Sequence, residues 1–369
     1  MNLKEKTMNL KTKTDFNDVK KRWTAFWNNE FIERPMICAT VPKNENSKQV
    51  ELSKTHYWNP CNKKYEEQLE LIDEWIDSTL FMYDLVPFIS PDHGPDQFAA
   101  WMGSTLKFSK SNIETNWAQP ILEDWETFLP VSLKEENETW QSYLKYSALL
   151  KNHGKNKYIV GMADLHSQMD AFSALRHPDK LCMDLYDTPE LVKKGTEQAR
   201  AMYPEVYQKL YEAGGMSAET GTISWLPLWC EDKFAVVQCD FSVFLSNEMW
   251  KEFVLPGIIE EVEFLDHCFY HLDGKQQIIH LDDLLAIKKL DGIQWVPGAG
   301  QPEMFSSHWR ELLRKILTAG KKIIVYGNMD LDTVKDIHND LGYKNIVYDI
   351  YGRNREEMET IIEWLIKNC

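Results

Sequence analysis

The sequence lacks the cysteine pairs and the long apolar run that would point to a secreted or membrane protein. Its seven cysteines, Cys38, Cys61, Cys182, Cys230, Cys239, Cys268 and Cys369, include no Cys-x-x-Cys pair, which argues against a disulfide framework and predicts reduced thiols. No stretch approaches the roughly 18 apolar residues of a membrane span. Residues 1–14 have no apolar core for a secretion signal. We therefore expect a cytoplasmic protein.

Basic residues are also scarce. The 369 residues include 41 Lys and Arg against 57 Asp and Glu, which gives a formal net charge of −16. An acidic surface repels nucleic acid and anionic membranes, so neither is expected as a partner. A highly anionic substrate is disfavoured for the same reason, unless a local basic pocket exists.

What the sequence does contain is a regular alternation of apolar, β-type runs with longer helical patterns. The runs cover residues 36–42, 79–87, 157–164, 222–229, 234–240, 268–273, 292–297, 322–328 and 345–350. Such alternation favours parallel strands joined by crossover helices. It predicts an α/β fold, a (β/α)8 TIM barrel with extra N-terminal helices, with a doubly wound sheet as the alternative. We expect residues 1–369 to form a single domain, residues 1–14 to be disordered or peripheral, and residues 90–138 to form an elaborated loop region.

Two helical segments are predicted in more detail. Pro256 lies inside the pattern over residues 247–265 and should kink or divide that helix, because proline removes a donor and clashes with the preceding turn. The last segment carries an i, i+3, i+4, i+7 stripe that should pack on the outside of the sheet: Met358, Ile361, Ile362 and Leu365.

A His-x-Asp pair, His271 and Asp273, ends one of the β-type runs. On a strand, residues i and i+2 share a face, so both side chains would reach one ligand or metal while Cys268 points the other way. The alternative is that Asp273 and Gly274 form only a turn and that His271 is a strand-end histidine with its hydrogen bonds satisfied.

Other polar and aromatic residues also lie at or just after the ends of the runs. A barrel brings these ends together around one mouth, where its chemistry takes place. Asp240 either faces this mouth or caps the next turn through Ser242, and Asp330 is a common type of helix N-cap. The candidates for substrate binding at the mouth are Asp164, His166, Trp225, Trp229, Trp295, Asn328 and Tyr351.

Several stretches together resemble the uroporphyrinogen decarboxylase-like superfamily, which also contains corrinoid-dependent methyltransferases. They are Arg22-Trp23-Thr24-Ala25-Phe26-Trp27, Glu33-Arg34-Pro35, Cys239-Asp240-Phe241-Ser242, Phe253-Val254-Leu255-Pro256, Tyr270-His271-Leu272-Asp273-Gly274, Asp291-Gly292-Ile293-Gln294-Trp295-Val296-Pro297-Gly298 and Gly327-Asn328-Met329-Asp330. They span nearly the whole chain in the expected order, and the resemblance implies a TIM barrel.

The chain departs from the decarboxylases of this superfamily. Their N-terminal signature is rich in arginine and grips a substrate with many carboxylates, whereas residues 36–42 here contain no arginine. An acidic protein without that grip has no evident means of offsetting the desolvation of a polyanionic tetrapyrrole. Asp84 lies roughly where the decarboxylases keep a catalytic aspartate, but this match is short.

The resemblance to the methyltransferase branch implies a metal site. Members that alkylate thiols hold zinc through His-x-Cys and a distant cysteine; here His271 matches the histidine and Asp273 replaces the first cysteine. Zinc could bind through His271 and Asp273 with a third ligand from Cys239, Asp240 or Glu231. The alternative is a metal-free acid–base pair in which Asp273 orients His271.

The expected function is therefore that of a methyltransferase that moves a methyl group between a small methylated substrate and a corrinoid (cobalamin) carrier protein. His271, Asp273 and Asp240 are the expected catalytic residues. Aromatic side chains at the mouth would form a cage for a methylated ammonium group or a slot for an aryl methyl ether. The alternative function is that of a cofactor-independent decarboxylase or lyase acting on a smaller acid. A third possibility is a non-catalytic barrel that binds a small molecule or partner.

Overall fold

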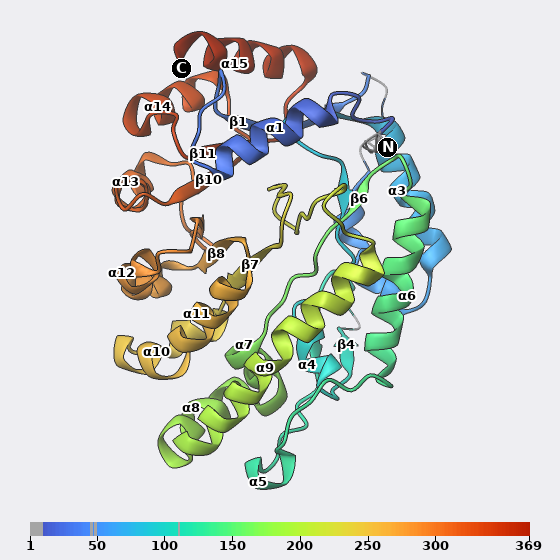
Figure 1. Ribbon diagram of the computed structural model, residues 1–369, viewed down its shortest axis with the longest axis vertical. Coiled ribbons are helices and arrows are strands. Elements are labelled where there is room, and N and C mark those ends of the chain that lie inside the picture. Colours follow the sequence, from blue (N-terminus) through green and yellow to red (C-terminus); the bar gives the residue numbers. More distant parts are fainter. Residues whose placement is uncertain (1–9, 45–46, 48–49, 110) are drawn as a thin grey trace, which may run out of the picture.

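The computed structural model describes residues 10–44, 47, 50–109 and 111–369, which form a mixed α/β fold with a central, mainly parallel sheet and many helices (Figure 1). The strands are β1 (Met36–Pro42), β2 (Thr79–Tyr83), β3 (Phe88–Ile89), β4 (Leu106–Phe108), β5 (Asn116–Ala118), β6 (Ile159–Val160), β7 (Phe234–Gln238), β8 (His267–Asp273), β9 (Gly292–Val296), β10 (Lys322–Gly327) and β11 (Ile346–Ile350).

Helices cover the outside of the strands, with α10 to α15 following one another along one side and α3, α6 and α9 on the other (Figure 1). The α-helices are α1 (Phe16–Trp27), α2 (Trp58–Cys61), α3 (Tyr65–Ser78), α4 (Gln97–Trp101), α5 (Trp125–Phe128), α6 (Glu138–His153), α7 (Gln168–Arg176), α8 (Pro178–Asp187), α9 (Pro189–Gly214), α10 (Asn247–Phe253), α11 (Leu255–Phe264), α12 (Leu281–Ala286), α13 (Arg310–Thr318), α14 (Leu331–Leu341) and α15 (Arg355–Asn368). The 3₁₀ helices are η1 (Leu52–Lys54), η2 (Asp240–Phe244), η3 (Lys275–His280) and η4 (Ser307–Trp309).

The main sheet has seven strands in the order β2-β1-β11-β10-β9-β8-β7. Neighbouring strands are parallel except for β1 and β2, which are antiparallel. A separate parallel pair is formed by β3, which follows β2, and β6, which lies between α6 and α7. The helices between the parallel strands are the crossover connections that the alternating sequence pattern predicts.

The predicted closed (β/α)8 ladder is not formed by the described residues. Residues 222–229, which were expected to be a strand between β6 and β7, instead fold back on themselves: Thr222 and Cys230 exchange two backbone hydrogen bonds, and Leu228 N–H donates to Leu226 O around Pro227. Proline has no N–H to donate to a ladder. A single backbone bond, from Met162 N–H to Ile223 O (2.6 Å), joins this segment to the β6 side. The ladder is therefore open between β6 and β7, and among the described residues no ladder joins β3 to the β2 edge of the main sheet either.

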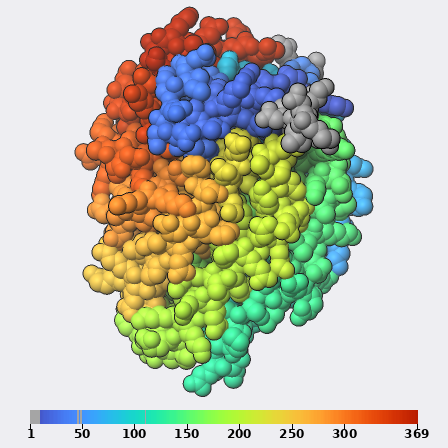
Figure 2. Space-filling view, viewed as in Figure 1, coloured from blue at the N-terminus to red at the C-terminus, as the bar shows by residue number. Residues whose placement is uncertain are grey.

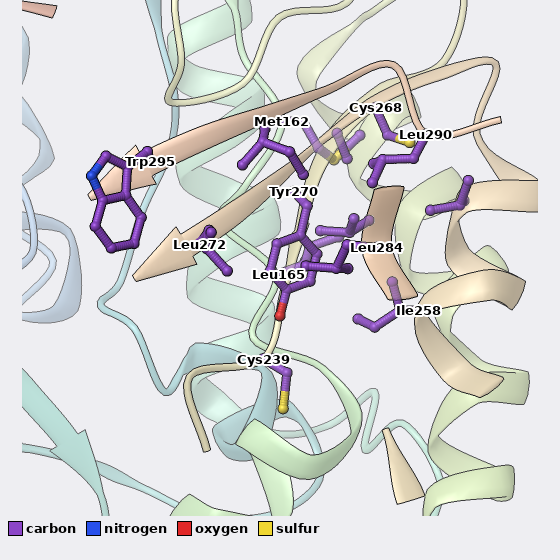
Figure 3. Close-up of a cluster of buried hydrophobic side chains, with 14 of the residues drawn as sticks. Met162, Leu165, Cys239, Ile258, Cys268, Tyr270, Leu272, Leu284, Leu290 and Trp295 are labelled. Carbon is purple, nitrogen blue, oxygen red and sulfur yellow. The ribbon is translucent and has the colours of Figure 1, made fainter. Parts of the chain in front are cut away.

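The two faces of the sheet belong to two different hydrophobic clusters. On β8, Cys268, Tyr270 and Leu272 pack in the outer cluster beneath the helices, whereas Phe269 belongs to an inner cluster that also contains residues of α1. Figure 3 shows part of the outer cluster. Because strand side chains alternate, His271 and Asp273 share the inner face with Phe269, as the His-x-Asp spacing predicts.

Helix α1 covers the amino ends of β7 and β8. The Trp27 ring stacks on His267, the first residue of β8, at 4.7 Å, and lies 5.5 Å from Phe234, the first residue of β7. Figure 2 shows residues of α1 (blue) at the surface, between the C-terminal segment (orange to red) and the middle of the chain (yellow-green). One end of the sheet is therefore closed by aromatic packing, and the carboxyl ends of the strands lie at the other.

The predicted division of the helix at Pro256 and the predicted packing of the last helical stripe are confirmed. Proline 256 lies in the first turn of α11, so the pattern over residues 247–265 is divided into α10 and α11. The stripe of α15 is fully buried. All seven cysteines are free, and none of the described helices is long and apolar enough to cross a bilayer.

The N-terminal segment corrects one expectation. Residues 1–9 lie outside the described residues, but residues 10–14 are not peripheral, because Leu10 and Lys13 are buried. Lys13 Nζ donates to Tyr83 O, and Lys11 N–H donates to Asn156 O (2.9 Å). The segment therefore packs against the body of the protein.

A buried ion pair joins α1 to the start of the sheet. Asp84, whose side chain is 0% exposed, accepts from Arg22 Nε at 2.8 Å, from Arg34 Nη1 at 2.5 Å and from Ile37 N–H at 2.8 Å. Burial raises the pKa of this carboxyl, but the two guanidinium groups overcome that effect and lower it. Because Asp84 lies beside the first residues of β1, it is a structural anchor far from the carboxyl ends of the strands.

Replacing Asp84 by Asn should lower the free energy of unfolding by about 3–5 kcal/mol, because two buried guanidinium groups lose their counter-charge. Denaturant unfolding at neutral pH measures this loss. The pKa of Asp84 is lower in the folded protein, so its contribution is present above the unfolded pKa and is lost as the pH falls through the folded pKa. The difference between the two proteins should therefore shrink below about pH 4. Asp18→Asn, at an exposed pair with Lys21, is the control and should change stability by less than about 0.5 kcal/mol.

Candidate functional site

Three side chains at the carboxyl ends of β7 and β8 form a group that could hold a metal ion. One ligand atom each from Asp240, His271 and Asp273 lies within 4.8 Å of the others. His271 and Asp273 come from the inner face of β8, and Asp240 is the first residue of η2, directly after β7. We call these three residues the triad.

His271 is held in one orientation by its neighbours. Its Nδ1 lies 2.6 Å from Gln294 Oε1 on β9, the residue paired with it in the sheet. Since an amide oxygen only accepts, Nδ1 carries a proton, so Nε2 is the nitrogen that the neutral imidazole would offer to a metal. The Trp225 ring meets the imidazole edge to face at 5.2 Å. A metal-binding histidine usually donates its other ring N–H to a carboxylate, a backbone carbonyl or water, and here the amide oxygen of Gln294 lies at that position.

Asp240 is positioned through its backbone by Asp170 of α7. The Asp170 carboxylate accepts from Asp240 N–H at 3.0 Å and from Phe241 N–H at 2.8 Å. Asp240 Oδ1 is buried and has no hydrogen-bond partner among the described residues. Burial, followed by the charge of Asp170, raises the pKa of Asp240 to about 6.

His166 and Asp164 form an ion pair beside the triad. His166 Nε2 lies 3.1 Å from Asp164 Oδ2, and its Nδ1 lies 3.6 Å from Asp170 and 3.8 Å from Asp240. Burial opposes the charge on His166, but Asp164 and Asp170 together raise its pKa well above the usual value. Burial likewise raises the pKa of Asp164, but His166 outweighs it and lowers that pKa. Both groups are therefore charged at neutral pH.

The donor set fits a divalent metal of borderline or hard character. One imidazole nitrogen and two carboxylate oxygens are ligands that zinc accepts, with room for an exogenous ligand at the fourth position. The unpartnered Oδ1 of Asp240 and the surplus of carboxylates around one imidazolium would both be relieved by a bound cation. The site can also work without metal, since His271 with a carboxylate beside it can move a proton.

Several residues predicted for the mouth lie elsewhere. Cys239, a predicted metal ligand, packs in the outer hydrophobic cluster with Trp295, so neither belongs to the triad (Figure 3). Of the three alternatives for a third ligand, Asp240 is the one grouped with His271 and Asp273. Trp229 lies at the opposite end of the sheet, where its backbone oxygen accepts from Trp27 Nε1 at 2.7 Å. Glu231 is exposed and follows the turn after Trp229.

Asn328 and Tyr351 lie at the same end of the sheet as the triad, but they lie at the rim of that end and outside the triad. Tyr351 is 45% exposed and borders a separate hollow of about 410 Å³ with Thr40 and Arg353. Asn328 is exposed, and its backbone oxygen accepts from Arg353. Burial, and then the charges of Tyr351 and Asp273, raise the pKa of Tyr326 of β10. The Tyr326 side chain therefore lies near both the rim and the triad. Asp330 caps α14 through Thr333 N–H, the structural alternative for that residue.

Four residues of the site were missed by sequence reasoning: Asp170, Gln238, Gln294 and Tyr326. Gln238 is paired with His271 in the sheet, and its Nε2 donates to Asp164 Oδ1 at 2.7 Å. Gln238 and Gln294 are both buried. An amide inside an otherwise apolar strand was the available signal, because such a group must find a polar partner on the inner face.

These observations define an α/β protein with a polar site, able to hold a metal, at the carboxyl ends of its parallel strands. One solved structure with a similar fold is a methyltransferase from Methanosarcina mazei, which is 12% identical in sequence; the match covers 94% of this chain and 97% of that chain with a TM-score of 0.60. This similarity shows that the two chains share a fold. No protein-family model and no curated protein matches the sequence.

Replacing Gln294 by Met should weaken zinc binding by roughly 10- to 100-fold, because the His271 ring loses the acceptor that fixes its tautomer. Titration against a chromophoric zinc chelator measures the affinity. His271→Ala should abolish this binding, whereas Gln208→Met, at an exposed position of α9, should leave it unchanged. Equal affinities for the wild type and all three variants would show that the triad binds no metal.

Proposed function

We propose that the protein is a methyltransferase that moves a methyl group between a small methylated substrate and a corrinoid carrier protein. The observation that carries this proposal is the triad at the carboxyl ends of β7 and β8, in a fold shared along nearly its whole length with a methyltransferase. Strand-end groups of this kind are where such α/β folds place their chemistry. We further propose that the arrangement is a variant of the (β/α)8 barrel in which side chains, such as Gln238 with Asp164, connect segments that no backbone ladder joins.

In this proposal the triad handles the heteroatom that loses or gains the methyl group. Zinc bound there would supply a Lewis acid that stabilises negative charge on that atom. Gln294 binds His271 Nδ1 and so leaves Nε2 for the metal or the substrate. Asp170 holds the backbone of Asp240 in place. Without metal, His271 beside Asp273 would deliver or accept the proton at the same atom. Methyl transfer also requires exclusion of water, to which the Trp225 ring against His271 contributes.

A carrier protein needs an accessible surface next to the triad. Phe244 at the end of η2 is 61% exposed and Ile279 in η3 is 55% exposed. The two 3₁₀ helices are joined by His280 Nε2, which lies 3.2 Å from Ser242 O. Exposed apolar side chains at the edge of a site support the docking of a partner, and the corrin ring must come close to the substrate for transfer to occur.

The alternative, a cofactor-independent decarboxylase acting on a smaller acid, has less support. Asp84 lies near the first residues of β1 and is held by Arg22 and Arg34, so it is placed for stability. No Lys or Arg is among the described residues that line the hollow beside the triad, and His166 in its wall is already paired with Asp164 and Asp170, which leaves a carboxylate substrate with no free basic group to bind it. Release of carbon dioxide in the absence of cobalamin would favour this alternative.

Incubating the protein with reduced cobalamin and a panel of methyl ethers, methyl thioethers and methylated amines should produce the absorbance change of methyl-cobalt formation. His271→Ala should lower the rate by roughly 100-fold or more, because it removes a group that acts directly on the reacting atom. His308→Ala, which removes an exposed imidazole of η4, is the matched control. No absorbance change with any donor would count against methyl transfer.

A further inference from the structure

A hollow of about 570 Å³ opens directly beside the triad, with His166 and Asp240 in its wall. This volume is within the range of small-molecule sites. The hollow lies between the β4–β5 hairpin, α7 and η2, since its lining includes Trp117, Asp170 and Phe241. A molecule bound there would lie against the triad through Asp240.

The charges around the hollow are mainly negative. Asp96, Asp170 and Asp240 line it, whereas no Lys or Arg does. His166 is already paired with Asp164 and Asp170, and His177 with Asp179. An anion entering this space would meet carboxylates without a free basic partner, whereas a cation would meet a favourable potential.

Aromatic rings form the outer wall of the same hollow. Trp117 is 44% exposed and Phe244 is 61% exposed, and the Phe244 ring lies 5.6 Å from that of the buried Phe241. Two exposed rings on one hollow give it an apolar surface that a ligand can cover. The face of an aromatic ring carries partial negative charge and attracts cations, most strongly where water is displaced. Acidic and aromatic groups in one hollow therefore select for the same kind of ligand.

We infer that this hollow binds the cationic head of the substrate, an alkylated ammonium group, while the heteroatom that gives or receives the methyl group lies at the triad. The inference rests on the proposed function and names its substrate class. A neutral aryl methyl ether would stack on the rings but would leave the carboxylates without a counter-charge. An anionic substrate would find no Lys or Arg among the described lining residues, and the two histidines there, His166 and His177, are already paired with carboxylates.

Three molecules of nearly the same shape separate these possibilities: choline, its neutral isostere 3,3-dimethylbutan-1-ol, and the anion 3,3-dimethylbutanoate. Titration calorimetry or ligand-observed NMR on the full chain should show that choline binds at least roughly tenfold more tightly than the other two. Equal or tighter binding of the neutral or anionic molecule would overturn the inference, and so would the absence of choline binding.

Substitutions in the lining of the hollow test whether choline binds there. Phe244→Ala and Trp117→Ala should each weaken choline binding by roughly three- to tenfold, because each removes an aromatic face. Trp117→Phe keeps an aromatic ring at this position and should therefore weaken choline binding less than Trp117→Ala does. Asp96→Asn should reduce the preference for choline over its neutral isostere. Tyr186→Ala, at an aromatic residue of α8 that is 74% exposed, is the control. Unchanged choline affinity in folded Phe244→Ala and Trp117→Ala proteins would place the cation elsewhere and refute the inference.

The choline-binding experiment and the methyl-transfer assay test the cation site and the proposed function separately. Choline binding with the expected order of affinities, but no methyl transfer from any donor, would support the cation site and reject the proposed function. Methyl transfer from neutral donors that saturating choline does not inhibit would support the proposed function and reject the cation site.

Discussion

The site depends on carboxylates that join two parts of the fold where the backbone does not. Between β6 and β7 the ladder is open, and the connection is made by Asp164, which accepts from Gln238, and by Asp170, which accepts from the N–H groups of Asp240 and Phe241. A charged acceptor makes a stronger hydrogen bond than a neutral one. These bonds set where η2 begins, and therefore where Asp240 stands relative to His271.

The same side chains explain why the site is strongly polar. Because carboxylates connect β6 to β7, several negative charges lie close together and are partly buried. This arrangement costs free energy unless positive charge is nearby. His166 supplies part of that charge. A metal at the triad, an ammonium group in the adjoining hollow, or both, would supply the rest, so that the groups which hold the fold together also favour cationic ligands.

Much of the fold could be predicted from the sequence. Runs of apolar residues predicted β1 and β7 to β11, because a strand buried on both faces must be apolar along its length. His-x-Asp on a strand predicted that His271 and Asp273 share a face, and alternation makes this independent of the surrounding topology. The segment over residues 222–229 has the same composition as a strand, yet it folds back around Pro227, because composition does not say which partner a backbone will find.

The sequence by itself determined which residues share a face along each strand, the division of the helix at Pro256 and the pairing of His271 with Asp273, since these follow from local periodicity and covalent geometry. Only the tertiary structure decided that Asp240 completes the group, that Gln294 orients the imidazole, and that Cys239, Trp229 and Trp295 lie outside the site. Contacts between strands depend on register and on which segments pair, and these are set by packing of the whole chain.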